Sequence, residues 1–423
     1  MEPAVTTLGA LLGLAVAIIL IVKKVNPAYS LILGAIIGGL LGGAGLMGTT
    51  NLVIDGARAI MPAVFRILTA GVLAGVLIQT GAAAKIAEQI IRVIGERGAL
   101  LALALSVLIL TAVGVFIDVA VITVAPIALA TAQKVGLPTM AIILAMIGGG
   151  KAGNMMSPNP NSIVTSENFH IDLASLMTAN IIPAIVGLIV TVLIATWLAR
   201  KYAGEPLGAG DVTVDEDAAE LPPFWGAIIG PILVIVLLAL RPLFGITIDP
   251  LLALPIGGII GCLAMGRIRN LNQYLTFGLG KMMPIAVLLL GTGALAGIIQ
   301  HSGLQHDTIT VLEALNLPVF LLAPISGILM SGATASTTAG SAVASSTFAP
   351  IITEYISPLA GAAMVHTGAT VLDHLPHGTF FHATGGSVYL DIQSRLKVIP
   401  YETLVGLAMT IVSTIIWGVM RYA

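Results

Sequence analysis

Polar and ionisable side chains interrupt long apolar runs at four places in this chain. Asp118 lies between Phe116-Ile117 and Val119-Ala120, and residues 331–341 gather six Ser and Thr hydroxyls. Residues 148–162 hold Lys151 and several amides, and residues 366–379 hold an Asp and three His. Ionisable groups in apolar surroundings are costly, so they mark ion or substrate pathways in membrane proteins. These side chains suit binding of a proton and of a small anion.

Two groups are candidates for a proton-binding site. Asp118 is the first, because a carboxylate without a partner in an apolar segment tends to hold a proton. The alternative for Asp118 is a structural role, as a helix cap or in an ion pair with Lys151 or Arg66. Asp373 and His374 are the second candidates, because they lie in a stretch that cannot stay helical and because His exchanges protons at physiological pH.

A larger set of side chains is predicted to bind the substrate, because hydroxyls and amides can bind hydroxyl groups and a lysine can bind a carboxylate. The candidates are Lys151, Asn154, Ser157, Asn159, Asn161, Thr334, Ser336, Thr337, Thr338, Thr367 and His377. The alternative for the hydroxyls is helix–helix packing. Lys151 alternatively extends its ammonium group to the membrane surface. The alternative for the polar segment 154–172 is a loop outside the membrane.

The same segments predict broken helices and re-entrant hairpins. Three glycines followed by Pro-x-Pro cannot form one continuous helix, since each proline removes a donor and clashes with the preceding turn. We expect interrupted helices near 138–162 and 358–380, and hairpins near 98–134 and 317–353. Unwound backbone at membrane depth must line protein or a water-filled cavity, and a helix N terminus there favours an anion.

The composition places these elements in a membrane. The chain has 423 residues, of which 57% are hydrophobic and only 9% charged, far from the quarter that is charged in soluble domains. No basic stripe suggests nucleic acid, and the single Cys262 excludes a disulfide framework and a thiolate metal cluster. Gly208-Ala-Gly210-Asp211 matches the GxGD pattern of aspartyl intramembrane proteases but lies in a polar linker. The second catalytic aspartate that such a protease carries in a membrane helix is missing. An enzyme and a metal site are therefore not expected.

The chain repeats itself after about 220 residues. Residues 71–81 (GVLAGVLIQTG) return at 293–303 as GALAGIIQHSG. We assign 1–202 to a first repeat, 203–222 to an acidic linker and 223–423 to a second repeat. Each repeat is predicted to hold five crossings and one hairpin. The ten crossings are expected near 5–22, 28–46, 58–80, 138–162, 174–200, 224–241, 250–266, 282–300, 358–380 and 399–421.

An odd number of crossings makes the second repeat insert upside down. With the N terminus outside, one side of the membrane collects thirteen basic residues and the other only Arg58, Arg241 and Arg421. The thirteen are Lys23, Lys24, Lys85, Arg92, Arg97, Lys134, Arg200, Lys201, Arg267, Arg269, Lys281, Arg395 and Lys397. This bias predicts extracytoplasmic termini and a cytoplasmic linker. Segments 83–96 and 304–315 are amphipathic and expected at the interface, either as arms of a mobile domain or as plain connectors.

Four segments together resemble the gluconate permease family of the ion-transporter superfamily. They are FIDVAVITVAPI at 116–127, MMSPNPNSI at 155–163, GATASTTAGSAVA at 332–344 and DHLPHGTFFHATGG at 373–386. The chain departs from the family in having Asp118 where Glu is usual, no His at the first break, and DHLPHG at the second. The resemblance covers essentially the whole chain.

The resemblance implies an all-α polytopic membrane protein with two inverted repeats and two re-entrant hairpins, working by an elevator-like motion. It implies proton symport of gluconate or a related hydroxy acid across a bacterial inner membrane, by a homodimer without a cofactor. The partners are then the organic anion, the proton and the bilayer. A sodium-coupled di- or tricarboxylate carrier, or a sodium–proton antiporter, is the alternative, because hairpin carbonyls and hydroxyls can also hold sodium.

Overall fold

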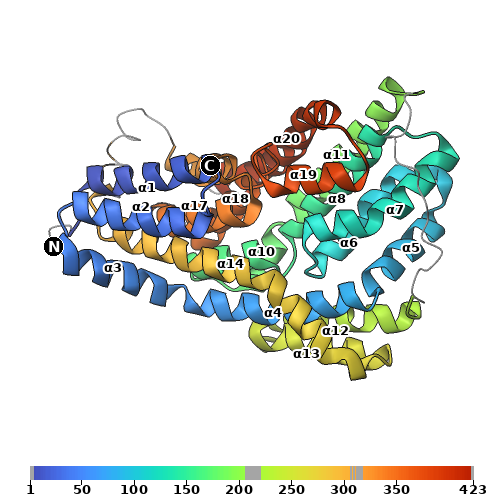
Figure 1. Cartoon of the computed structure of the whole chain (residues 1–423), viewed down its shortest axis with the longest axis horizontal. Helices are drawn as coiled ribbons and strands as arrows, with labels where there is room; N and C mark the ends of the chain where they lie inside the picture. Colours follow the sequence, from blue (N-terminus) through green and yellow to red (C-terminus); the bar gives the residue numbers. More distant parts are fainter. Residues whose placement is uncertain (1–3, 205–220, 305–306, 308–309, 311–317, 421–423) are drawn as a thin grey trace.

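The computed structural model describes all residues except 1–3, 205–220, 305–306, 308–309, 311–317 and 421–423. Most of the acidic linker and of segment 304–315 thus lies outside the described residues. Every regular element in the described part is a helix, and one isolated β-bridge joins Val5 to Ser302. The expected all-α fold is confirmed (Figure 1).

The first half contains eleven α-helices in the described residues. They are α1 Thr7–Val22, α2 Pro27–Leu41, α3 Gly45–Ala59, α4 Met61–Gln79, α5 Ala82–Ile94, α6 Ala99–Ala112, α7 Ile117–Val135, α8 Thr139–Met155, α9 Pro160–Asn168, α10 Leu173–Ala179 and α11 Ile181–Lys201. A 3-10 turn, η1 Glu96–Gly98, precedes α6.

The described residues of the second half contain helices that match most of these. They are α12 Phe224–Phe244, α13 Pro250–Ala264, α14 Leu271–Gln300, α16 Leu322–Thr334, α17 Thr337–Ile352, α18 Pro358–Gly368, α19 Thr379–Ser387 and α20 Ile392–Thr414. Shorter elements are the 3-10 turns η2 Ile268–Asn270 and η3 Val319–Leu321 and the π-helical turn η4 Ile415–Val419.

Both hairpins and both helix breaks are present in the structure. Helices α6 and α7 turn back at 113–116, and α16 and α17 at Ala335-Ser336. The first broken helix is α8 and α9, interrupted at 156–159, and the second is α18 and α19, interrupted at 369–378. Pro160 begins α9, where a missing amide proton costs nothing.

Three helices differ from the sequence prediction. Helix α3 occupies 45–59, where no separate helix was expected, and only Thr49 and Gly56 on it are buried. Helix α14 is 30 residues long and begins well before 282. The span expected at 174–200 is divided into α10 and α11 at Asn180. Amphipathic α5 is a helix, and it meets α6 at an angle of 107°.

The backbone itself repeats between the halves. Residues with positive φ recur at separations of 219 to 223: Lys24 with Gly245, Gly43 with Gly266, Gly114 with Ala335, and His170 with Tyr389. Non-glycine residues rarely adopt this conformation, so His170 at 52° and Tyr389 at 53° are a specific match. The duplication read in the sequence is therefore also present in the chain path.

The two halves are built into each other. Helix α1 packs on α2 and α12 on α13, while α2 packs on α14 of the second half and α13 on α4 of the first. Helices α4 and α14 cross directly (Figure 1). A Cβ at Gly278 would lie 1.9 Å from the carbonyl oxygen of Gly71, so this crossing requires glycine.

Several helices are suited to cross a bilayer. Five described helical segments are long and apolar enough by length and composition, or six if the bent pair α5–α6 is one span. The five are Met61–Gln79, Ile117–Val135, Ile181–Lys201, Ile268–Gln300 and Ile392–Val419. Large apolar side chains such as Leu8, Leu193, Trp225 and Leu252 are exposed on the outer helices. In water such surface would be a liability, but in lipid it is the expected exterior.

Candidate functional site

A buried cluster of charges joins the two broken helices. Lys151, on α8, is only 1% exposed. Its Nζ donates to the carbonyl of Thr370 at 2.7 Å and to Asp373 Oδ1 at 2.7 Å, and it lies 2.9 Å from His374 Nδ1. An ammonium group has three protons, so these three acceptors satisfy it completely. The alternative that Lys151 extends to the membrane surface is wrong.

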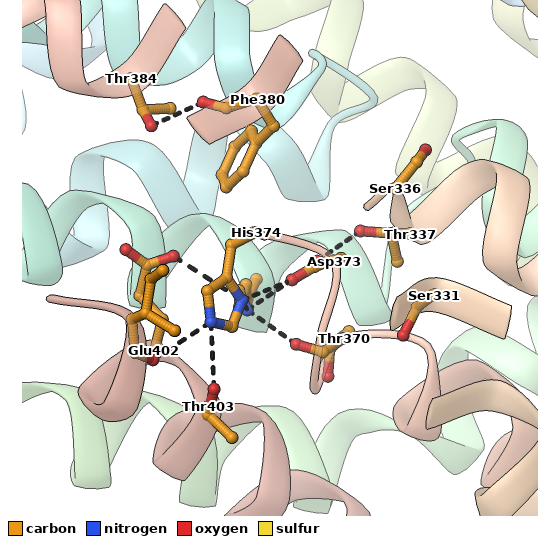
Figure 2. A network of polar contacts seen from close by, with 12 residues as sticks. Ser331, Ser336, Thr337, Thr370, Asp373, His374, Phe380, Thr384, Glu402 and Thr403 are labelled. Atoms are coloured by element: carbon orange, nitrogen blue, oxygen red, sulfur yellow. Dashed lines mark hydrogen bonds and ion pairs between the residues drawn. The ribbon is translucent and has the colours of Figure 1, made fainter. Parts of the chain in front are cut away.

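His374 is held in one tautomer by its neighbours. Its Nε2 lies 3.1 Å from the carbonyl of Ile399 and 3.1 Å from Thr403 Oγ1 (Figure 2). A carbonyl only accepts, so Nε2 carries the proton and Nδ1 accepts from Lys151. The neutral imidazole thus matches Lys151 and the partners of Nε2, while Asp373 Oδ1, 3.0 Å from Nδ1, faces it as a second acceptor.

The second hairpin touches this cluster through its tip. Thr337 Oγ1 donates to Asp373 Oδ2 at 2.6 Å. Ser336 caps α17 by accepting from the amide of Ala339 at 3.2 Å, and Ala335 holds the tight turn with a φ of 45°. The N terminus of α17, where backbone amides lack helical partners, is therefore fixed beside a buried carboxylate.

A cavity of about 870 Å³ opens at the same hairpin tip. It lies between the tip, the second helix break, the start of α2 and the middle of α14. Its polar lining comprises Lys24, Asn26, Thr334, Ser336, His377, Thr379 and His382. None of the described residues that line it is acidic. A cavity of this size and charge suits a small anion with hydroxyl groups.

Both cavity histidines have one ring nitrogen occupied. His377 Nε2 donates to the carbonyl of Ala333 at 3.2 Å, and His382 Nε2 donates to the carbonyl of Pro376 at 2.8 Å. Because a carbonyl cannot donate, Nδ1 of each ring is left to accept a hydroxyl proton, or to donate once protonated. His377 is half-buried and His382 exposed, so the two sit at different depths.

Several predicted binding residues instead make their hydrogen bonds within the two broken helices. Asn154, Ser157 and Asn159 are at most 5% exposed. Asn159 Nδ2 donates to Asn154 Oδ1, and Ser157 Oγ donates to the carbonyl of Asn154 at 3.1 Å. Thr367 bonds back to the carbonyls of Ala363 and Met364 within α18. None of these four predicted residues lines the cavity.

Asn161 belongs to a second buried group around His366. His366 Nε2 lies 2.7 Å from Asn161 Nδ2, and Nδ1 lies 3.1 Å from Asn180 Nδ2. A neutral imidazole cannot accept at both nitrogens, and Asn180 Oδ1 has no partner. Turning the Asn180 amide solves both problems, with Nδ1 donating to Asn180 and Nε2 accepting from Asn161. His366 then joins α18, α9 and the start of α11.

Asp118 lies apart from the charge cluster. It is half-buried in the first turn of α7, and no hydrogen bond or ion pair links its carboxylate to another described residue. Lys151 pairs with Asp373 and Arg66 with other acids, so the alternative of a structural pair with either is wrong. Thr338, its counterpart as second residue of α17, is half-buried too.

Two charged residues of the cluster were not predicted. Arg395 and Glu402 are seven residues apart on α20, and both are about 1% exposed. They form an ion pair, and Arg395 also donates to the carbonyl of Phe381 at 3.3 Å and stacks over its ring. The charge distribution predicts Arg395 on the cytoplasmic face, and the structure shows its side chain buried at the start of α20. The available signal was Glu402 itself, an acid inside the crossing expected near 399–421.

A separate ionic group joins the halves elsewhere. Arg66, on α4, bonds Asp249 Oδ1 at 2.9 Å and Oδ2 at 2.7 Å, and pairs with Glu167 of α9. Asp249 caps α13 by accepting from the amide of Leu251 at 2.8 Å. The hydrogen bonds from Arg66 lower the pKa of Asp249. These side chains and His170 line a polar cavity of about 250 Å³.

Comparison with known proteins gives consistent matches across the chain. A family model described as GntP family permease matches residues 5–420. An uncharacterized transporter of Haemophilus influenzae is 59% identical over 419 residues, 99% of each chain. The Gnt-II system L-idonate transporter of Escherichia coli is 22% identical, covering 86% of this chain and 88% of its own. The crystal structure of the Alcanivorax borkumensis YdaH transporter, described as having an unusual topology, matches with a TM-score of 0.68 at 18% identity over 90% of each chain.

Proposed function

Because the chain belongs to the GntP family of permeases and is a membrane transporter, we propose that it carries gluconate or a related sugar acid together with a proton. One observation carries this proposal. The hydroxyl-rich tip of the second hairpin lines the acid-free cavity and, one residue later, bonds a carboxylate of the buried charge cluster. A substrate in the cavity and a proton in the cluster would act on the same turn of chain.

The cavity supplies groups suited to both ends of a sugar acid. The carboxylate of the sugar acid docks at the N terminus of α17, where free amides and the helix dipole favour an anion. Ser336 and Thr334 lie at that end, and His377 and Asn26 bind hydroxyls. The remaining predicted residues around the first break fix the backbone against which the hairpin closes. The similarity to an L-idonate transporter supports a sugar acid as the substrate.

Coupling requires that the half-loaded carrier changes conformation poorly. Proton binding at His374 and Asp373 alters the contacts that hold Thr337, and so alters the hairpin that receives the substrate. Asp118, in the first turn of α7 after the bend of the first hairpin, is the other candidate. In the predicted orientation Lys24 is cytoplasmic, so the cavity opens to the cytoplasm. The transporter acts in a bacterial inner membrane, with inverted repeats, extracytoplasmic termini, an elevator-like motion and a homodimeric assembly as further parts of the proposal.

Uptake by proteoliposomes tests the transport reaction. The purified chain is assayed with gluconate, L-idonate, shorter hydroxy acids and dicarboxylates, with imposed proton or sodium gradients. Accumulation of a sugar acid driven by a proton gradient alone is expected. A dependence on sodium, or preference for dicarboxylates, would replace the proposal with the alternative carrier class.

One substitution decides between the proton candidates. Asp118→Asn is expected to retain proton-driven accumulation if His374 and Asp373 hold the proton. Loss of accumulation with preserved substrate exchange would assign the proton to Asp118.

Cysteine labelling near Lys24 and Arg269 tests the orientation in the membrane, since both loops are expected on the cytoplasmic face.

A further inference from the structure

The buried acid Glu402 has one oxygen without a hydrogen bond. Its Oε1 pairs with Arg395, while Oε2 has no hydrogen-bond donor and lies 3.8 Å from His374 Nδ1. The side chain of Glu402 is fully buried. Figure 2 shows Glu402 and Asp373 on opposite sides of the imidazole. An unmatched charged oxygen in such a place is costly unless some state of the protein uses it.

From this arrangement we propose that Glu402 and His374 together bind the transported proton. The inference rests on the proposed proton symport and names the atoms that take the proton. His374 Nδ1 is the protonation site, and Glu402 Oε2 is the acceptor for the new N–H. Arg395 positions Glu402, since its guanidinium is fixed between the ion pair, the Phe381 carbonyl and Thr384 Oγ1.

The charges facing His374 balance when the ring is neutral. Lys151 from α8 and Arg395 from α20 supply two positive charges, and Asp373 and Glu402 supply two negative ones. Thr337 from α17 bonds Asp373, and Thr403 and the Ile399 carbonyl of α20 contact Nε2. The neutral cluster therefore has no net charge. Adding one proton leaves a single positive charge, which a sugar-acid carboxylate at the neighbouring hairpin tip would neutralise.

Protonation rearranges the contacts of Nδ1. In the neutral ring Nδ1 accepts from Lys151, but a protonated Nδ1 can only donate, and an ammonium group cannot accept. Asp373 Oδ1, 3.0 Å away, already receives a Lys151 proton, whereas Glu402 Oε2 receives none. A carboxylate oxygen can accept twice, so both oxygens can receive the new N–H. We assign it to Glu402 Oε2, which otherwise has no donor, and this requires the 3.8 Å separation to close by about 1 Å as the ring releases Lys151. Lys151 then shifts toward Asp373, the group that holds Thr337.

The competing explanation is that Glu402 only anchors Arg395 and so fixes α19 on α20. Glu402→Gln separates the two roles, because the amide oxygen still accepts from Arg395 while the negative charge is removed. Glu88→Gln, which removes a surface carboxylate paired with Lys85, is the matched control. Glu402→Asp keeps the charge on a shorter side chain.

The experiment compares two readouts in proteoliposomes. Substrate exchange at equal pH reports binding and movement, and accumulation under a pH gradient reports coupling. For Glu402→Gln we expect exchange within about threefold of wild type and accumulation reduced at least tenfold, with partial recovery in Glu402→Asp and no change in Glu88→Gln. Equal loss of both readouts, or normal accumulation, would overturn the inference.

Two further controls keep the result unambiguous. If Glu402→Gln does not fold, Arg395→Met combined with Glu402→Gln leaves no buried unpaired charge, and the same two readouts apply. Failure of the wild type to accumulate substrate under a pH gradient would overturn the proposed symport and this inference together. Normal coupling in wild type and in Glu402→Gln would overturn the inference alone.

Discussion

Lys151 is the residue whose removal should damage the fold most directly. Substitution Lys151→Met keeps a long side chain in the same space and removes the ammonium group. Asp373, 4% exposed, is then buried without its cation, and the Thr370 carbonyl and His374 Nδ1 lose their donor. Breaking a buried pair by deleting one partner costs about 3–5 kcal/mol. We expect a loss of that size in the free energy of unfolding.

The double variant Lys151→Met with Asp373→Asn isolates the cause. It leaves no uncompensated charge, and Thr337 Oγ1 can still donate to the amide oxygen at position 373. Removing both members of a buried pair is often close to neutral, so we expect at least half of the lost stability to return. Unfolding in mixed micelles, followed by the fluorescence of the three tryptophans, measures both variants.

Two results would refute this reasoning. A loss below about 1 kcal/mol for Lys151→Met would mean that the cluster is hydrated or that Asp373 is protonated in the resting protein. Equal destabilisation of the single and double variants would show that packing, rather than charge, sets the stability of the helix breaks.

Three further outcomes follow from local geometry. Gly278→Ala should cost about 1–3 kcal/mol by overpacking against the Gly71 carbonyl, whereas Gly280→Ala, whose Cβ meets nothing within 4 Å, should not, and equal thermal stabilities would contradict the observed helix crossing. Asp249→Asn should lower Tm at neutral pH, because Arg66 lowers the pKa of Asp249 and so stabilises the fold above the ordinary pKa of 3.8. This stabilisation is lost as the pH falls below 3.8 and Asp249 becomes protonated, so a Tm difference that persists at low pH would contradict the assignment. Ser336→Ala removes the α17 cap, worth about 1 kcal/mol, and should raise KM for the sugar acid more than it lowers kcat, while an unchanged KM would separate the cap from the binding site.

Much of the fold could be predicted because breaks in helices are local. Pro158 and Pro160 cannot continue a helix, and the chain is interrupted at 156–159. The duplication is visible as similar segments about 220 residues apart, and it recurs in the positions of the positive-φ residues. Helix α3 was missed because its sequence is neither apolar enough to span nor charged enough to read as a loop.

The site was predicted less completely because side-chain partners depend on tertiary packing. Lys151, Asp373 and His374 were chosen for their depth in the chain, but no sequence rule pairs residues 222 apart. Asn154, Asn159 and Asn161 are predicted ligands for hydroxyls, yet the amides of Asn154 and Asn159 bond each other and that of Asn161 contacts His366. Unwound segments need such internal partners before they can bind anything else.

The chemistry of this transporter arises where the two halves stop matching. With the 218-residue separation of the broken helices, Lys151 corresponds to Ala369 and Asp373 to Met155. Arg66 corresponds to Leu288, which lines the large cavity, while Arg66 itself lines the small cavity beside Asp249 and Glu167. Two related conformations of an exactly symmetric scaffold would be equal in energy, and residues that differ between the halves remove that equality. The unmatched charges are therefore the groups on which the proposed coupling of proton and substrate depends.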